Sequence, residues 1–157
     1  MKIHFVGIGG IGMSALAQHM ARKGHTVSGS DAVKSEVTDM LQKLGMKISI
    51  GHSEKNVEGI NLCVATSAAN ANNVEICYCV KNKIPVLARQ ELLGKEFNSY
   101  RTRIAVSGTH GKTTTCGMLA AAFESVGQMP TAFIGGMTKR GNYIGGDEPC
   151  VVEACEY

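Results

Sequence analysis

The chain has 157 residues, of which 44% are hydrophobic and 18% charged, and its formal net charge at pH 7 is +3. This length allows one domain, or one domain and part of a second. The weak, scattered positive charge does not indicate nucleic-acid binding. No apolar run approaches the roughly 20 residues of a membrane-spanning helix, and the first residues lack the pattern of a signal peptide, so we expect a cytoplasmic protein.

The sulfur-containing residues are interpreted as packing residues. No C-x-x-C motif is present and several cysteines lie in apolar runs, which favours buried thiols in a reducing compartment over disulfides or metal ligands. The cysteines are Cys63, Cys77, Cys79, Cys116, Cys150 and Cys155. The methionines at 13, 20, 40 and 118 recur at core positions of predicted helices.

The first part of the chain alternates short apolar strands with amphipathic helices. Strands are expected at 2–6, 25–29, 47–50, 61–66 and 85–88, and helices at 12–23, 35–44, 73–82 and 89–97. Such alternation implies a parallel sheet with right-handed crossovers. Residues 1–98 are therefore predicted to form a Rossmann-like α/β domain.

A polar stretch interrupts this alternation, and we place a linker at 99–103. Beyond it we expect strands at 104–107, 131–136 and 150–155, and one helix at 112–126 that follows a glycine loop. One helix cannot cover both faces of a parallel sheet. Residues 104–157 are therefore interpreted as the beginning of a P-loop α/β domain that continues in a longer protein.

The first glycine-rich turn is "GIGGIG", residues 7–12. It matches G-x-G-x-x-G after a strand and before a helix, where Gly7 permits the tight turn, Gly9 a close approach to a diphosphate and Gly12 close helix packing. Asp31 ends the second strand, where it either accepts hydrogen bonds from a nucleoside or caps the next helix. The turn predicts a diphosphate ligand without identifying it, although NAD or FAD is the usual one.

The second glycine-rich turn is "SGTHGKTTT", residues 107–115. It lacks the first glycine of G-x-x-x-x-G-K-[ST], because that position is Val106. The N–H groups of residues 109–113 are still arranged to surround a phosphate. Lys112 is expected to reach the β- and γ-phosphate oxygens, and the Thr113 hydroxyl to bind Mg²⁺.

Two further residues near this loop have open roles. His110 either contacts a substrate from the loop or is exposed and solvated. Glu153 lies in the apolar segment "VVEAC", where an unpaired buried carboxylate costs several kcal/mol. Because ligands bind at the carboxyl ends of parallel strands, Glu153 is interpreted as a metal-binding or water-orienting group near Lys112, or else as an edge-strand residue that faces solvent.

With several other segments, the two glycine turns resemble the Mur ligase family. The segments are "HFVGIGGIGMSALA" at 4–17, "VSGSD" at 27–31, "GH" at 51–52, "TSAAN" at 66–70, "SGTHGKTTT" at 107–115 and "EACEY" at 153–157. They cover nearly the whole chain in the family's order. The resemblance implies that the first domain holds a UDP-sugar and that the shortened loop holds ATP with Mg²⁺.

The resemblance also implies a reaction in peptidoglycan precursor synthesis. ATP would phosphorylate the lactyl carboxylate of UDP-N-acetylmuramate, and the amine of L-alanine would attack the acyl phosphate. A recycling ligase that attaches a whole peptide to the same UDP-sugar is the nearest alternative. An NAD-dependent oxidoreductase domain and a non-enzymatic nucleotide sensor are the others.

The family's functional residues are carried over position by position. Contacts with the UDP-sugar are expected from Gly9, Gly10, Ile11, Gly12, Met13, Ser14, Asp31, Ser67, Ala68 and Arg89. Contacts with ATP are expected from Gly108, Thr109, His110, Gly111, Lys112, Thr113 and Thr114. Lys112, His110 and Glu153 are expected to act in catalysis, with His110 between ATP and the UDP-sugar, and Thr113 and Glu153 to bind Mg²⁺.

The sequence departs from the family's pattern at two places. "NNVE", residues 72–75, replaces N-P-E, a change that we expect to affect a helix start more than the chemistry. Cys155 replaces a carboxylate, which puts a second metal contact in doubt, although Glu153 and Glu156 remain. Because the family's amino-acid-binding domain lies beyond Tyr157, we expect these residues alone to bind the UDP-sugar without ligation, and ATP-dependent turnover would contradict this.

Overall fold

A computed structural model describes residues 1–70 and 72–154. The chain forms two compact units. Unit 1 ends at Leu92 and unit 2 begins at Leu93. The linker predicted at 99–103 stays a prediction, and the sixth strand begins at Arg103. Within the described residues, no helix combines the length and the apolar character needed to cross a bilayer.

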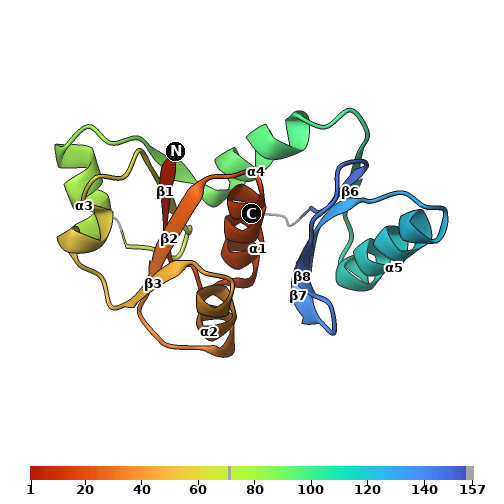
Figure 1. The fold of residues 1–157 in the computed structure, drawn as a ribbon, viewed down its shortest axis with the longest axis horizontal. Coiled ribbons are helices and arrows are strands. Elements are labelled where there is room, and N and C mark those ends of the chain that lie inside the picture. The colour runs from red at the N-terminus through yellow and green to blue at the C-terminus, as the bar shows by residue number, and fades with distance from the viewer. Residues whose placement is uncertain (71, 155–157) are drawn as a thin grey trace. The chain divides into compact units, whose positions relative to one another are not determined.

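Unit 1 contains a five-stranded parallel sheet, as the sequence predicts. Its strands are β1 (Lys2–Val6), β2 (Thr26–Asp31), β3 (Lys47–Ile50), β4 (Leu62–Ala65) and β5 (Val86–Ala88), in the order β3-β2-β1-β4-β5 (Figure 1). The central strand β1 is buried from Ile3 to Val6, because helices cover both faces of the sheet. The carboxyl ends of all five strands therefore meet along one edge.

The helices of unit 1 lie on both faces of this sheet. They are α1 (Ile11–Arg22), α2 (Glu36–Lys43), the 3₁₀ helix η1 (Glu54–Val57), α3 (Val74–Lys81) and the first part of α4 (Arg89–Asn98). Helices α1 and α2 cover one face and α3 the other (Figure 1). Ser35 begins α2 with a capping box, in which the Ser35 and Thr38 side chains each accept a backbone N–H of the other residue.

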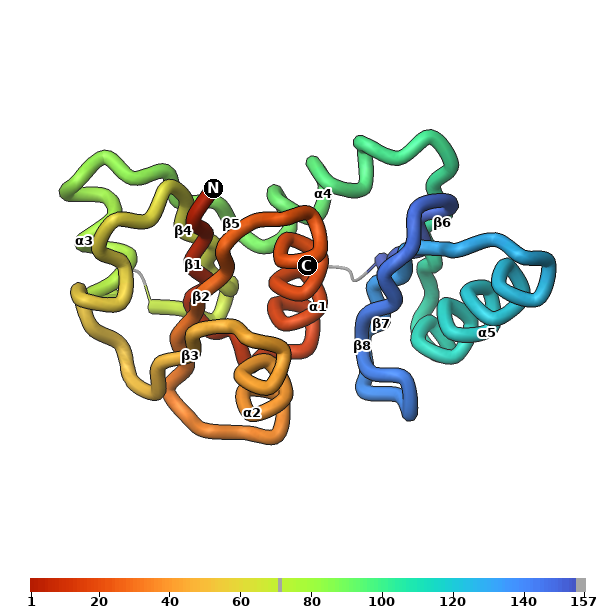
Figure 2. Tube along the Cα trace, in the orientation of Figure 1, coloured from red at the N-terminus to blue at the C-terminus, as the bar shows by residue number. Residues whose placement is uncertain are grey.

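Unit 2 contains a four-stranded mixed sheet with one helix of its own packed against it. Its elements are β6 (Arg103–Val106), α5 (Lys112–Ser125), β7 (Thr131–Thr138), β8 (Gly141–Ile144) and β9 (Cys150–Glu153), and the strand order is β6-β9-β7-β8. Strands β6, β9 and β7 are parallel. Strand β8 pairs antiparallel with β7 in a hairpin that Figure 2 traces, and the sequence analysis missed it. Glycines and charged residues around the turn, which are depleted in strands, hid it.

The interpretation of the methionines and cysteines as buried packing residues is wrong at one residue of each type. Met118 is 68% exposed on α5, because apolar and small residues surround this helix instead of forming one stripe. Cys77 is exposed on α3, whereas Cys63, Cys79, Cys116 and Cys150 are buried. No disulfide links these five cysteines, and Cys155 lies outside the described residues.

Candidate functional site

The Asp31 carboxylate fixes the first glycine turn from the end of β2. Its Oδ2 atom accepts the N–H of Gly9 at 2.8 Å, and its Oδ1 atom accepts the N–H of Val33 at 3.2 Å. The next helix is capped by Ser35, so the alternative role of Asp31 as a helix cap is wrong. The Gly9 N–H is therefore engaged within the protein, and each Asp31 oxygen keeps lone-pair capacity for a ligand donor.

The absence of a side chain at Gly12 makes room for Arg89. An added Cβ would lie 2.8 Å from Arg89 Nη1, so this glycine is explained by the arginine and not, as expected, by helix-to-strand packing. Arg89 is half-buried, and its guanidinium contacts no acceptor among the described residues. The N–H groups of Gly12 and Met13 in the first turn of α1 also lack an acceptor there. The guanidinium and the two N–H groups therefore make the start of α1 a candidate anion-binding site.

A cavity of about 430 Å³ opens at the carboxyl edge of the unit 1 sheet. It is lined by Val6, Gly7, Gly10, Asp31, Ala32, His52, Thr66, Ala68, Ala69, Asn70 and Asn73. We call it the glycine-turn cavity. The predicted contacts Gly10, Asp31 and Ala68 line it, and Ser67 does not. The side chains of Met13 and Ser14 are buried.

Sequence reasoning missed a buried carboxylate beside this cavity, that of Glu75 on α3. Glu75 is 0% exposed, and its oxygens accept hydrogen bonds from four groups. The donors are the Ser30 hydroxyl, His52 Nδ1 at 2.9 Å, the Ser53 N–H at 3.2 Å and Asn56 Nδ2 at 2.6 Å. His4 Nε2 lies 3.8 Å away, and His4 is itself buried beside Ser28 and Ser30. The segment "NNVE" therefore contributes more than a helix start.

The donors around Glu75 determine its charge state. Burial by itself raises the pKa of a carboxyl group, but the nearby His4 ring and the hydrogen bonds from Ser30, Asn56 and His52 outweigh it and lower the pKa of Glu75 to about 2. Glu75 is therefore a carboxylate at neutral pH. Two members of this network lie in segments quoted from the sequence, His52 in "GH" and Glu75 in "NNVE", but no sequence signal connected them.

The second glycine turn lies at the carboxyl ends of β6 and β9 in unit 2. Gly111 begins α5 in the left-handed conformation with φ of +79°, which favours glycine. Lys112 Nζ donates to Gly108 O at 2.6 Å, so the lysine side chain folds back over the loop. The N–H groups of residues 108–114 have no acceptor among the described residues. Donors and a cation are thus gathered at the start of a helix, as a phosphate site requires.

Glu153 faces this loop from the end of β9, a central strand of its sheet, so its alternative role as an edge-strand residue is wrong. The Thr113 hydroxyl lies 3.0 and 3.3 Å from the two Glu153 oxygens, and the Gly135 N–H donates to Glu153 at 2.7 Å. A hydroxyl and a carboxylate oxygen fit Mg²⁺, which takes few protein ligands and fills its shell with water and phosphate oxygens. No cluster of three His, Cys, Asp or Glu side chains suited to a metal ion occurs in the described residues.

Gly135 is predicted to be essential for this arrangement. An added Cβ would lie 2.1 Å from Glu153 Oε2, so Gly135→Ala should displace the Glu153 carboxylate. Because this carboxylate is the end of a flexible side chain, the main cost is the lost hydrogen bond from the Gly135 N–H, and the free energy of unfolding should fall by about 0.5–1.5 kcal/mol. Urea titration measures this change. The matched control is Gly117→Ala inside α5, where a Cβ meets nothing within 4 Å and should stabilise by about 0.5–1 kcal/mol. Equal effects of the two substitutions would contradict the prediction.

The side chains of the other predicted loop residues make no hydrogen bond with any described residue. Thr109, His110 and Thr114 are exposed, and His110 makes no hydrogen bond with any described residue. Its role between ATP and the UDP-sugar stays a prediction. Glu156 and the departure at Cys155 lie outside the described residues.

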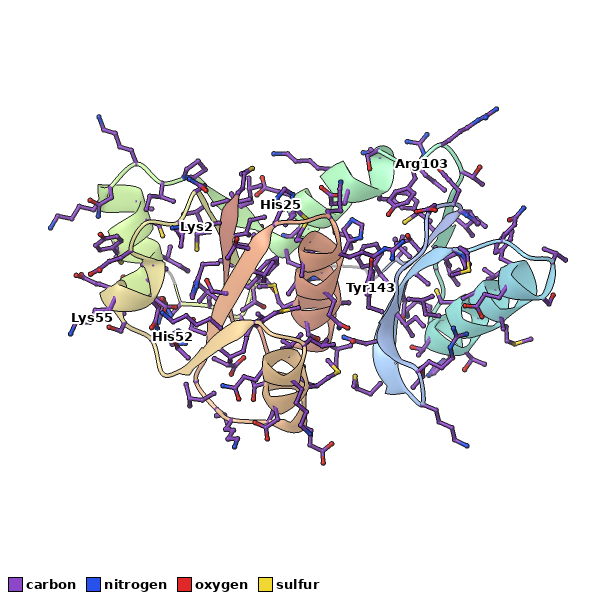
Figure 3. The ribbon with its side chains drawn as sticks, viewed as in Figure 1. Lys2, His25, His52, Lys55, Arg103 and Tyr143 are labelled. Carbon is purple, nitrogen blue, oxygen red and sulfur yellow. The ribbon has the colours of Figure 1, made fainter. Side chains whose placement is uncertain are left out.

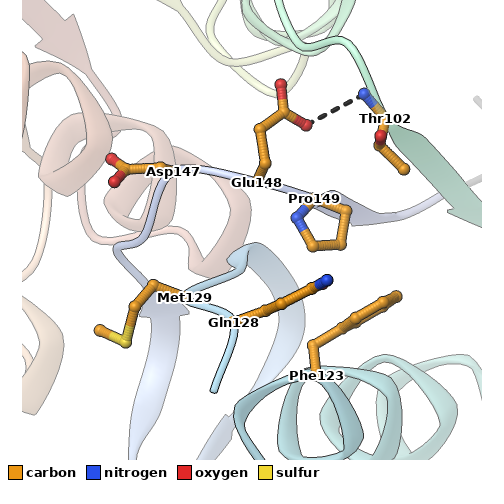
Figure 4. A pocket seen from close by; sticks show the side chains of 7 residues that line it. All are labelled: Thr102, Phe123, Gln128, Met129, Asp147, Glu148 and Pro149. Atoms are coloured by element: carbon orange, nitrogen blue, oxygen red, sulfur yellow. Dashed lines mark hydrogen bonds between the residues drawn. The ribbon is translucent and has the colours of Figure 1, made fainter. Parts of the chain in front are cut away.

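A cavity of about 520 Å³ in unit 2 does not contain the loop. It is lined by Thr102, Phe123, Gln128, Met129, Asp147, Glu148 and Pro149 (Figure 4). Its Glu148 carboxylate accepts the N–H groups of Arg101 and Thr102 at 2.7 and 3.0 Å. These residues lie at the amino ends of β6 and β9, opposite Lys112 and Glu153. Because α/β sheets bind ligands at the carboxyl ends of their strands, we assign the phosphate site to the loop and not to this cavity.

Comparison with known protein families identifies the family of the chain. The sequence model described as "Mur ligase family, catalytic domain" matches residues 2–101, well over half of the chain. The chain belongs to the Mur ligase family. The Mur ligase resemblance drawn from the two glycine turns is thereby confirmed.

Individual Mur ligases resemble the chain along its whole length. The UDP-N-acetylmuramate–L-alanine ligases of Lachnoclostridium phytofermentans and Clostridium tetani are 45% and 42% identical over 100% and 99% of the chain. These alignments cover 34% and 35% of the two relatives, so the chain spans about a third of their length.

Solved Mur ligase structures agree with the fold. The UDP-N-acetylmuramate–alanine ligase of Thermotoga maritima superposes with a TM-score of 0.93 at 39% identity, over 98% of this chain and 36% of that one. A murein peptide ligase of Psychrobacter arcticus superposes with a TM-score of 0.89 at 30% identity, over 100% of this chain and 38% of that one. The α/β fold with a parallel sheet followed by a second sheet is thus confirmed.

Proposed function

We propose that the chain is the UDP-sugar-binding unit and the beginning of the ATP-binding unit of a UDP-N-acetylmuramate–L-alanine ligase. The observation that carries the proposal is the similarity, along the whole of this chain, to about a third of ligases of that name at 42–45% identity, joined to two separate candidate anion sites. The higher identity and TM-score of the Thermotoga ligase favour this activity over the recycling peptide ligase.

The glycine-turn cavity is suited to a nucleoside diphosphate. Gly10, the N-cap of α1, lines it, and beyond this lining the N–H groups of Gly12 and Met13 and the guanidinium of Arg89 would neutralise the diphosphate. Its acceptors lie at the ends of β2 and β3, where Asp31 and His52 would receive donors of the nucleoside. A ligand with a polar nucleoside joined to two phosphates matches both ends.

The loop of unit 2 is suited to Mg²⁺·ATP. Bound ATP would supply the phosphoryl group that turns the carboxylate of UDP-N-acetylmuramate into an electrophile for the amine of L-alanine. Lys112 would neutralise charge on the β- and γ-phosphates, and the N–H groups of residues 108–114 would hold their oxygens. Thr113 and Glu153 would hold the magnesium ion, and Gly135 would orient Glu153.

Isothermal titration of the 157-residue chain tests the proposal. UDP-N-acetylmuramate should bind saturably and compete with UDP, whereas NADH should produce no heat of binding. Mg²⁺·ATP should bind independently of UDP, because the two ligands occupy different units. Binding of NADH in competition with UDP, or no response to UDP-N-acetylmuramate, would contradict the assignment.

Arg89→Ala should weaken UDP binding by about tenfold, because it removes a charge-assisted contact with the diphosphate. The free energy of unfolding should change by less than about 0.5 kcal/mol, since Arg89 contacts no acceptor in the described protein. Titration at two salt concentrations should show a weaker salt dependence in the variant. The control is Lys47→Ala at the exposed first residue of β3, and equal affinities of the two variants would argue against the role of Arg89.

A further inference from the structure

The hydrogen-bond network beneath the glycine-turn cavity constrains one cavity-lining side chain, that of His52. His52 follows β3 (Figure 3), and its side chain is 27% exposed. Its Nδ1 atom is turned inward, 2.9 Å from Glu75 Oε2 and 3.1 Å from the Ser30 hydroxyl. The buried face of the ring is thus fixed by the protein, and the other edge borders the cavity.

The chemistry of Glu75 determines which ring nitrogen carries the proton. An ionised carboxylate only accepts hydrogen bonds, so Nδ1 must be protonated to bind it. The Ser30 hydroxyl donates its one proton to the same Glu75 oxygen, so it has none to offer to Nδ1. Nδ1–H therefore points to Glu75, and Nε2 is the nitrogen left for a ligand, with no hydrogen-bond partner among the described residues.

The surroundings indicate what Nε2 would bind. His52 and Asp31 both line the cavity at the carboxyl ends of β3 and β2, which are neighbouring strands. The Asp31 carboxylate repels a phosphate here, whereas the start of α1, where Gly10 lines the cavity, and the cationic Arg89 beyond the lining attract one. The ring in its Nδ1–H tautomer offers an acceptor, which suits a ribose hydroxyl or the imide N–H of a pyrimidine.

We propose that His52 Nε2 accepts a hydrogen bond from the nucleoside of the ligand, and that Glu75 is the positioning residue that holds His52 in the required tautomer. This inference rests on the proposed function, because it assigns one contact within the same cavity. Glu75 acts only through His52, from within the protein.

Substitution of His52 by asparagine separates a ligand contact from a structural one. The amide nitrogen of asparagine can take the place of Nδ1 and still donate to Glu75, but asparagine has no group at the position of Nε2. His52→Asn should therefore keep the melting temperature within about 3 °C of the wild type and weaken UDP binding by about five- to tenfold. His25→Asn is the control, since His25 precedes β2 at the opposite end of the sheet (Figure 3).

Nitrogen-15 NMR of the histidine rings reads the tautomer without any ligand. In the wild-type chain, neutral His52 should carry its proton on Nδ1, and added UDP should shift the Nε2 resonance as that atom accepts a hydrogen bond. Glu75→Gln should populate the other tautomer, because the carboxamide presents both a donor and an acceptor to the network.

Three results would overturn the proposal. They are an Nε2–H tautomer in the wild type, wild-type affinity for UDP in a folded His52→Asn variant, and an unshifted Nε2 resonance at saturating UDP. Each leaves the proposed function standing if the wild-type chain binds UDP-N-acetylmuramate. Absence of that binding would overturn both.

Discussion

Glu75→Ala is expected to lower the free energy of unfolding by about 3–5 kcal/mol, a large fraction of the stability of a small domain. The substitution removes the one acceptor shared by Ser30, His52, Ser53 and Asn56. Donors left unsatisfied in a buried site each cost about 1–3 kcal/mol, and the carboxylate also contacts His4. Urea unfolding followed by circular dichroism measures the change.

The control for this prediction is Glu58→Ala. Glu58 is exposed and follows η1 close to the same network, so its removal should alter the free energy of unfolding by less than about 0.5 kcal/mol. A Glu75→Ala variant as stable as Glu58→Ala would show that the buried network contributes little to the fold.

The same carboxylate produces an acid-dependent loss of stability. The pKa of Glu75 falls from 4.5 to about 2 on folding, so the unfolded chain binds the proton more readily than the folded one. The contribution is fully present above pH 4.5 and is lost as the pH falls from 4.5 through 2. It amounts to about 3 kcal/mol. The stability difference between wild type and Glu75→Gln should shrink by this amount between pH 6 and pH 2, and a pH-independent difference would contradict the assignment.

Lys112→Ala should weaken Mg²⁺·ATP binding to the chain by about 10- to 100-fold. The lysine is the cation of the 107–115 loop, and a hydrogen bond to a charged partner is worth about 1.5–3 kcal/mol. UDP binding should be unchanged, because the glycine-turn cavity belongs to the other unit. Fluorescence titration with a labelled ATP analogue, in competition with ATP, measures the affinity.

Lys139→Ala is the matched control for the loss of positive charge. Lys139 is exposed in the turn between β7 and β8, and its removal should leave the ATP affinity within about twofold of the wild type. Equal losses in both variants would show that the chain attracts ATP through its general charge, and that the loop does not bind it specifically.

The fold of unit 1 was predictable because short strand segments, apolar in β1, β4 and β5, alternate with amphipathic helical segments. The predicted strands at 2–6 and 47–50 have the observed bounds, and the other three agree within two residues. The hairpin of β7 and β8 was not predictable, because Gly135, Gly136 and the charged turn interrupt the apolar pattern of a strand.

The sequence predicted the residues of the 107–115 loop but not the buried network around Glu75. Lys112 and Thr113 are adjacent in one loop, so their joint role follows from spacing. The network of Glu75 draws its partners from β2, the segment after β3, and η1, and no local pattern connects those elements. A glutamate in the first turn of a helix is ordinarily solvated, and only the packing of α3 on the sheet buries it.

Mapping both ligands on one amide NMR spectrum of the chain tests the central claim most directly. UDP-N-acetylmuramate should shift resonances of Gly10, Asp31 and His52 and leave the 107–115 loop unchanged, and Mg²⁺·ATP should do the reverse. Shifts of the unit 1 residues by NADH in place of UDP-N-acetylmuramate, or both nucleotides acting on the same residues, would contradict the assignment of two distinct nucleotide sites.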